Sequence, residues 1–294
     1  MNEIVVPRPS PKEVANAFLT PRAQQRRQAL FLESGEAIRI PTPQGAIALQ
    51  RAGTGPAVLL LHGWEGQAAD LAAFAAPLRA AGFSVVAMHL PAHGDSAGTQ
   101  TSLPESARAL HVVGKALGPL HAVIAHSMGA AILSEALHCG LVVQRVVMLA
   151  SPARYEHYVR SYAVTAGLDA VATESMLSIL SSRIGADVRG ISMPGRAPER
   201  RQPALFIHSA DDRVVSIEDS LATAESWPGA RHLRVDGLGH MRLLADPKVV
   251  AAAVGFAVNA GDERDTQFSA PGDRLSPASR CRFPPLHPGD HHED

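Results

Sequence analysis

The chain has 294 residues, of which 46% are apolar, and this is enough to build one large α/β domain. Its formal net charge of −1 gives no electrostatic basis for binding nucleic acid or an anionic membrane surface. Its two cysteines, Cys139 and Cys281, are too few for a disulfide scaffold or a four-thiolate zinc site.

The first 35 residues are predicted to be an N-terminal extension that contains a short amphipathic helix with Val14, Phe18 and Leu19 on its apolar face. This segment lacks the apolar region of a secretory signal. No apolar run in the chain approaches the roughly 20 residues that span a bilayer. We therefore expect a soluble, cytoplasmic protein.

From Glu36 onward, strand-length apolar runs alternate with helical patterns. The predicted strands are 37–40, 46–49, 57–61, 83–88, 121–125, 145–149, 204–208 and 231–235. The predicted helices are 68–81, 104–117, 128–138 and 247–258. Short strands that are apolar throughout suit a parallel sheet covered on both faces, and their alternation with helices predicts an α/β fold with a mostly parallel, doubly wound sheet.

One interval breaks this alternation. About 50 residues, roughly 153–202, separate two consecutive strands, and the first part of them has helical spacing. We predict a small helical cap there, inserted into a domain that spans 36–260. From 261 to 294 the composition shifts to Asp, Ser, Pro, Arg and His, which predicts a disordered tail.

The most informative motif is Ala-His-Ser-Met-Gly at 125–129, between a predicted strand and a predicted helix. A nucleophile elbow needs this context, because its serine sits in a strained turn and requires small residues two positions away. Gly129 meets this requirement, and Ala125 presents only a methyl group where glycine is usual. The motif predicts Ser127 as a nucleophile.

Two later strands end in residues that could activate such a serine. The strand 204–208 leads into Asp211 and Asp212, and the strand 231–235 leads into His240. Catalytic groups in open α/β sheets gather at the carboxyl ends of the strands. Gly237 and Gly239 would allow a tight loop to bring His240 over Ser127.

Taken in order, four motifs make the region 55–258 resemble the α/β-hydrolase superfamily. They are Leu-Leu-Leu-His-Gly-Trp at 59–64, Pro-Ala-His-Gly-Asp-Ser at 91–96, the elbow, and the Asp–His pair. In detail the chain resembles small-capped bacterial esterase-like serine hydrolases. The resemblance implies the order serine, acid, histidine, and the family pattern that starts at Ser209 selects Asp212 rather than Asp211 as the acid.

The resemblance also implies an oxyanion hole made of the backbone N–H groups of Trp64 and Met128. His62 and Glu65 lie in the same loop as Trp64. For both we expect a loop-shaping hydrogen bond or ion pair, and contact with substrate is the alternative. No metal or nucleotide cofactor is expected, because the metal-binding, dinucleotide and phosphate-loop motifs are absent.

The expected activity is hydrolysis of a carboxylic ester or related acyl compound, a small-molecule substrate, through an acyl-enzyme. The same three residues also serve thioesterases, peptidases, acyltransferases and C–C hydrolases, so these alternatives stay open. A binding module without turnover is a further alternative, against which the intact Ser, Asp and His argue. The sequence does not predict an oligomeric state.

Overall fold

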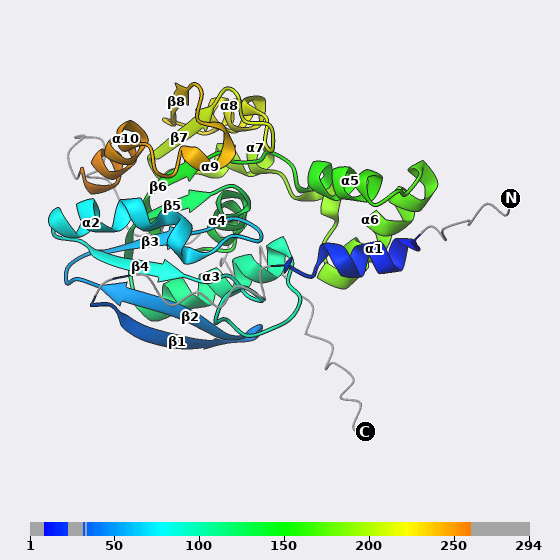
Figure 1. Ribbon diagram of the computed structural model, residues 1–294, viewed down its shortest axis with the longest axis horizontal. Coiled ribbons are helices and arrows are strands. Elements are labelled where there is room, and N and C mark those ends of the chain that lie inside the picture. The colour runs from blue at the N-terminus through cyan, green and yellow to red at the C-terminus, as the bar shows by residue number, and fades with distance from the viewer. Residues whose placement is uncertain (1–8, 23–31, 33, 260–294) are drawn as a thin grey trace, which may run out of the picture.

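The computed structural model describes residues 9–22, 32 and 34–259. Its centre is an eight-stranded sheet with the strand order β1-β2-β4-β3-β5-β6-β7-β8 (Figure 1). The strands are β1 (Glu36–Thr42), β2 (Gly45–Ala52), β3 (Ala57–Leu61), β4 (Ser84–Met88), β5 (Leu120–His126), β6 (Val143–Leu149), β7 (Ala204–Ser209) and β8 (Arg231–Val235). β2 is antiparallel to both β1 and β4, and the strands from β4 to β8 are parallel.

Strands β3 to β7 are buried on both faces, as their continuous apolar runs predict, whereas the edge strands β1 and β8 are partly exposed. Along β5, Val123 and Ala125 belong to one core cluster, whereas Ala122 and Ile124 belong to the other. Side chains alternate between the faces of a strand, so the buried stretch 122–125 of β5 needs an apolar residue at every position. This confirms the predicted doubly wound, mostly parallel sheet.

Helices from different parts of the chain complete the two cores. The first core contains side chains of α3 and α4, and the second contains side chains of η2, α2 and α10. The bounds are η2 (Ala68–Leu71), α2 (Ala72–Ala80), α3 (Leu103–Leu117), α4 (Met128–His138), α8 (Ile217–Ser226), α9 (Gly239–Arg242) and α10 (Pro247–Val258). None of the described helices is long and apolar enough to cross a membrane.

The interval predicted as a cap contains two longer helices and three short ones. They are α5 (Tyr155–Thr165), α6 (Ala170–Ile184), η3 (Val188–Gly190), α7 (Met193–Arg196) and η4 (Ala197–Glu199). α5 and α6 project from one end of the sheet (Figure 1). α1 (Pro11–Phe18), from the N-terminal segment, packs against both of them.

The three short helices of the cap and α8 lie where the sequence predicts no element. Side-chain caps account for part of this difference. Asp187 accepts a hydrogen bond from the N–H of Arg189, and Ser192 accepts one from that of Gly195. Ser216 caps α8 in the same way. The tail predicted over 261–294 lies outside the described residues.

Candidate active site

Ser127 lies in a sharp turn between β5 and α4. Its backbone has φ 52° and ψ −126°, a conformation that non-glycine residues rarely adopt and that costs about 1–3 kcal/mol. The surrounding structure holds this turn, since the N–H of Ser127 donates to the carbonyl oxygen of Leu149, 2.8 Å away on the neighbouring strand. The turn exposes the serine hydroxyl at the carboxyl end of β5.

The turn fits only because two neighbouring positions are glycine. A Cβ atom at Gly129 would lie 2.4 Å from the carbonyl oxygen of His62 and 2.8 Å from that of Leu61. At Gly63 it would lie 3.0 Å from Cβ of Ser127. The first turn of α4 therefore packs directly onto the end of β3.

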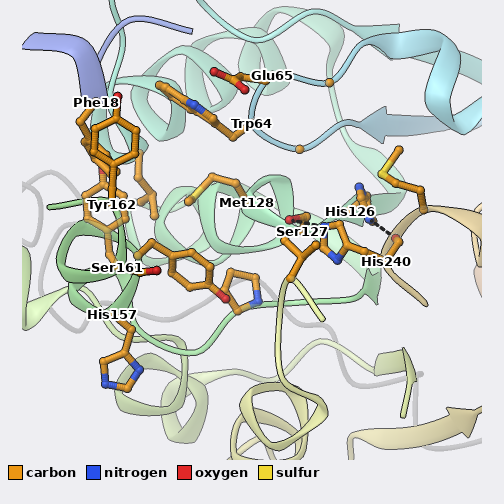
Figure 2. Close-up of a pocket in the computed structure, with 18 of the residues that line it drawn as sticks. Phe18, Trp64, Glu65, His126, Ser127, Met128, His157, Ser161, Tyr162 and His240 are labelled. Carbon is orange, nitrogen blue, oxygen red and sulfur yellow. Dashed lines mark hydrogen bonds between the residues drawn. The ribbon is translucent and has the colours of Figure 1, made fainter. Parts of the chain in front are cut away.

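The three side chains predicted as catalytic lie in one hydrogen-bonded line. Nε2 of His240 lies 3.0 Å from Oγ of Ser127 (Figure 2), and Nδ1 of His240 lies 2.7 Å from Oδ2 of Asp212. An ionised carboxylate only accepts hydrogen bonds, so Nδ1 of His240 carries the proton. In the neutral ring Nε2 is then an acceptor, aimed at the serine hydroxyl.

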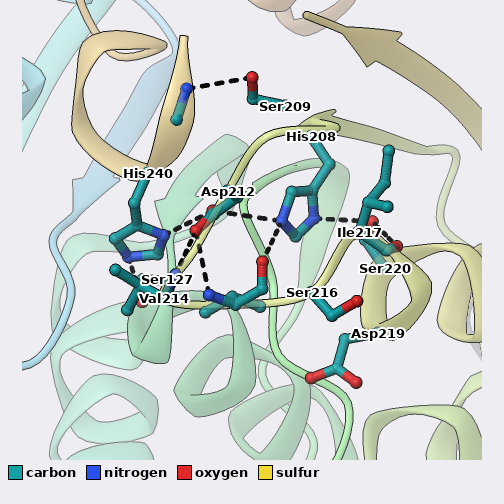
Figure 3. A network of polar contacts seen from close by, with 12 residues as sticks. Ser127, His208, Ser209, Asp212, Val214, Ser216, Ile217, Asp219, Ser220 and His240 are labelled. Atoms are coloured by element: carbon teal, nitrogen blue, oxygen red, sulfur yellow. Dashed lines mark hydrogen bonds and ion pairs between the residues drawn. The ribbon is translucent and has the colours of Figure 1, made fainter. Parts of the chain in front are cut away.

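Asp212 is the most heavily hydrogen-bonded side chain of the site (Figure 3). Its side chain has no exposed surface, and Oδ1 accepts from the N–H groups of Val214 and Val215 at 2.8 and 3.0 Å. Burial alone would raise the pKa of Asp212. The hydrogen bonds from His208, His240 and these two amides outweigh burial and hold this pKa far below its usual range. Asp212 is therefore ionised.

His208, the penultimate residue of β7, is a second histidine on this carboxylate, and no role was predicted for it. It is fully buried, with Nε2 3.3 Å from Oδ2 of Asp212 and 3.1 Å from the carbonyl oxygen of Val215. Both of these oxygens are acceptors, so Nε2 carries a proton. Nδ1 lies 2.8 Å from Oγ of Ser220 on α8, which anchors the ring. In the sequence, the feature that could have pointed to His208 is its position near the end of a buried strand, four residues before Asp212.

Asp211 has a different position from Asp212. It is partly exposed, and its Oδ1 accepts hydrogen bonds from Oγ of Ser209 at 2.5 Å and from the N–H of Gly239 at 3.1 Å. These contacts support the short helix α9, which begins beside His240. Gly237 and Gly239 have φ values of 78° and 59°, as the predicted tight loop requires.

His126, next to Ser127, also holds the loop that carries His240. Its Nε2 donates to the carbonyl oxygen of His240 at 3.0 Å. Burial, reinforced by the proximity of His240, lowers the pKa of His126 to about 3. The ring is therefore neutral, and its contact is with the backbone of His240 rather than with the hydroxyl of Ser127.

The loop after β3 is held by buried histidines. His62 Nδ1 donates to the carbonyl oxygen of Gly63 at 2.7 Å, and its Nε2 accepts from the N–H of Leu90 at 3.1 Å. Burial holds the pKa of His62 well below its usual range, so it is a neutral loop contact. The N–H of Glu65, at φ 55°, donates to Nε2 of His93. These bonds tie the β3 loop to the β4 loop.

Glu65 makes an ion pair and also borders the site. Its Oε1 accepts from the N–H of Arg22 at 3.1 Å and lies 3.6 Å from Nε of the same arginine. Trp64 and Met128, predicted as oxyanion donors, line the cleft that contains Ser127. Met128 is the first residue of α4, so its N–H has no acceptor within the helix.

A cleft of about 790 Å³ lies between the sheet and the cap. Tyr155, Tyr158 and Tyr162 of α5 line it. Leu168, Met176 and Leu177, also in the cap interval, are buried in the core instead. Phe18 of α1 also lines the cleft, which sequence reasoning did not predict. Among the described residues, no group of three or more His, Cys, Asp or Glu side chains could hold a metal ion.

Solved structures similar to this chain include hydrolases of several kinds. An esterase (EaEST) from Exiguobacterium antarcticum is 17% identical with a TM-score of 0.61, and the match covers 76% of this chain and 100% of that one. The thioesterase domain from the curacin biosynthetic pathway is 18% identical with a TM-score of 0.57, and the match covers 77% of this chain and 99% of that domain. The putative non-heme bromoperoxidase BpoC from Mycobacterium tuberculosis H37Rv is 20% identical with a TM-score of 0.57, and the match covers 73% of this chain and 97% of that one.

At these identities the structural matches establish the fold alone, and they agree with the predicted α/β-hydrolase architecture. No curated protein matches the chain significantly. The model of the alpha/beta hydrolase family, however, matches residues 58–253, which include Ser127, Asp212 and His240. Since this match covers most of the chain, the protein belongs to the alpha/beta hydrolase family.

Proposed function

We propose that the protein is a serine hydrolase that cleaves a carboxylic ester through an acyl-enzyme on Ser127. The observation that carries the proposal is the hydrogen-bonded line from Ser127 Oγ to His240 Nε2, at 3.0 Å, and from His240 Nδ1 to Asp212 Oδ2, at 2.7 Å. This geometry lets the histidine remove the hydroxyl proton while the carboxylate stabilises the imidazolium that forms.

The proposed reaction has two halves. Ser127 Oγ attacks the acyl carbon, His240 takes the proton, and the tetrahedral oxyanion is bound by the N–H groups of Met128 and Trp64. His240 then returns the proton to the departing alcohol. In the second half, His240 activates a water molecule that attacks the acyl-enzyme, and the carboxylic acid leaves as Ser127 regains its proton.

The buried polar groups around the acid support this assignment. A histidine base works only in the tautomer that leaves Nε2 free, and the ionised Asp212 selects that tautomer. The bond from His126 to the backbone of His240 holds the ring in place. Asp211 contacts Ser209, Gly239 and the exposed Arg242, and none of these contacts involves the His240 ring.

The first test compares the wild-type protein with Ser127→Ala. We expect the wild type to hydrolyse p-nitrophenyl esters and to react covalently with a fluorophosphonate probe. The variant should lose at least about 10⁴ of the turnover and all of the labelling, because no other hydroxyl in this position can form the acyl-enzyme. A variant that keeps full turnover and labelling would overturn the mechanism.

The bond that is cleaved is tested separately. Oxygen esters, thioesters and amides with the same acyl group should be compared at equal concentration. We propose the oxygen ester as the preferred substrate, and a higher kcat/KM on the thioester would assign the chain a thioesterase activity instead. A protein that labels but releases no acid would be an acyltransferase or an incomplete enzyme rather than a hydrolase.

A further inference from the structure

We propose that α1 forms the far wall of the acyl pocket and that its Phe18 selects substrates with a long, uncharged, apolar acyl chain. This inference rests on the proposed function, since it names the substrate class of the same site. It concerns a segment that lies about forty residues before the region matched by the family model, 58–253. The family match therefore says nothing about it.

Phe18 joins the two sides of the cleft. Its ring stacks on Trp64 of the β3 loop, with centroids 6.3 Å apart and planes 16° apart. On the other side it meets two rings of α5, Tyr155 at 5.9 Å and Tyr162 at 5.2 Å. One side chain from the N-terminal segment thus closes an aromatic wall that neither the core nor the inserted cap completes alone.

α1 is held firmly enough to serve as a wall. Val14 and Ala15 are buried in the main core cluster, and Arg183 of α6 donates a hydrogen bond to Asn16. On the opposite side, the N–H of Thr101, just before α3, donates to the carbonyl oxygen of Leu19 at 2.9 Å. The helix is attached to both the cap and the core, so its position fixes the width of the cleft.

The position of the wall predicts which substrates reach it. Phe18 and Tyr162 lie at one end of the cleft and Ser127 at the other, with Met128 between them (Figure 2). A short acyl group bound to Ser127 stays near Met128. A long acyl chain extends along the cleft to the Phe18 ring, where burial of its methylene groups stabilises binding.

Charge in the cleft favours an uncharged chain. Apart from histidines, the charged side chains that line the cleft are Arg22, Glu65, Asp70 and Asp219. Arg22 pairs with Glu65, Asp70 accepts from the N–H of Gln67, and Asp219 accepts from the N–H of Ala153 and the hydroxyl of Tyr158. Each already has a partner within the protein, so a charged group on the acyl chain would gain little from any of them.

The test compares Phe18→Ala with the wild type on p-nitrophenyl octanoate and p-nitrophenyl acetate. We expect kcat/KM for the octanoate to fall by about tenfold and kcat/KM for the acetate to change by less than about twofold, because only the longer chain contacts the ring. Phe18→Leu should recover part of the loss on octanoate. Lys12→Ala, on the exposed side of α1, is the matched control and should leave both substrates unchanged.

A binding measurement separates this inference from the proposed chemistry. In the Ser127→Ala background, isothermal titration with methyl octanoate should give a dissociation constant that rises about tenfold when Phe18→Ala is added. Equal loss on acetate and octanoate, or unchanged octanoate binding in this background, would overturn the role of Phe18. Absence of hydrolysis and labelling in the wild type, with chain-length-dependent binding retained, would instead overturn the proposed function and leave the pocket assignment standing.

Discussion

The two sides of the cleft are built from different kinds of contact. Beneath Ser127, the side chains of Asp212, His208 and His126 are buried and hydrogen-bonded, and the backbone approaches so closely that Gly129 has no room for a Cβ atom. Above it, the wall made by Phe18 and the tyrosines of α5 is aromatic, and Phe18, Tyr158 and Tyr162 are partly exposed. The lower side has one workable arrangement, because hydrogen bonds and close packing are directional. Apolar contact is much less directional, so the wall can accept apolar chains of different shape without moving.

If this contrast is right, damage to the lower side is independent of the substrate. Asp212→Asn should lower kcat by about 10⁴ on acetate and octanoate alike, because an amide stabilises neither the required tautomer nor the imidazolium. Phe18→Ala should discriminate between the same two esters. The matched control is Asp211→Asn, whose side chain can still accept from Ser209 and Gly239 and should have a much smaller effect. Steady-state kinetics of both variants on both esters decides the point.

The close packing beneath the serine can be broken directly. Gly129→Ala should destabilise the protein by about 1–3 kcal/mol, since the added methyl group meets the carbonyl oxygens of His62 and Leu61. The control is Gly255→Ala in α10, where an added Cβ meets no atom within 4 Å. There the helix should gain up to about 1 kcal/mol. Urea denaturation measures both changes, and equal stability of the two variants would contradict the packing argument.

A smaller effect follows from the neutral state of His126. The pKa of its ring is about 3 in the folded protein and about 6.5 in an unfolded chain. Below pH 6.5 the unfolded chain therefore binds a proton that the folded protein does not, and stability falls by about 1.4 kcal/mol per pH unit as the pH drops toward 3. Other buried histidines, including His62, add to this slope.

The corresponding variant is His126→Gln, which keeps a donor for the carbonyl oxygen of His240. Between about pH 6 and about pH 4, the unfolding free energy of the variant should fall less steeply with decreasing pH than that of the wild type. The difference in slope should correspond to one proton fewer taken up on unfolding. Above about pH 7 the two slopes should agree. Parallel slopes throughout this range would show that His126 is protonated in the folded state.

How much could be predicted from the sequence differs between these two sides. The elbow at 125–129, the acid and the histidine are encoded locally, since each needs a particular residue at the end of an apolar strand. His208 stands on such a strand, but its role depends on Asp212 turning back toward it. Phe18 was assigned to an apolar helix face, and nothing local indicates that this face meets Trp64 and α5.

The sequence by itself determined the alternation of strands and helices, the strained turn at Ser127 and the order of the partners that follow it. The spacing of apolar residues, the residues that favour turns and the size of side chains can all be read from one short segment of the sequence. Only the tertiary structure decided that His208 shares the carboxylate of Asp212, that His126 holds the backbone of His240, and that Phe18 closes the cleft. These depend on contacts between segments far apart in the chain, and such contacts are set by how the whole core packs.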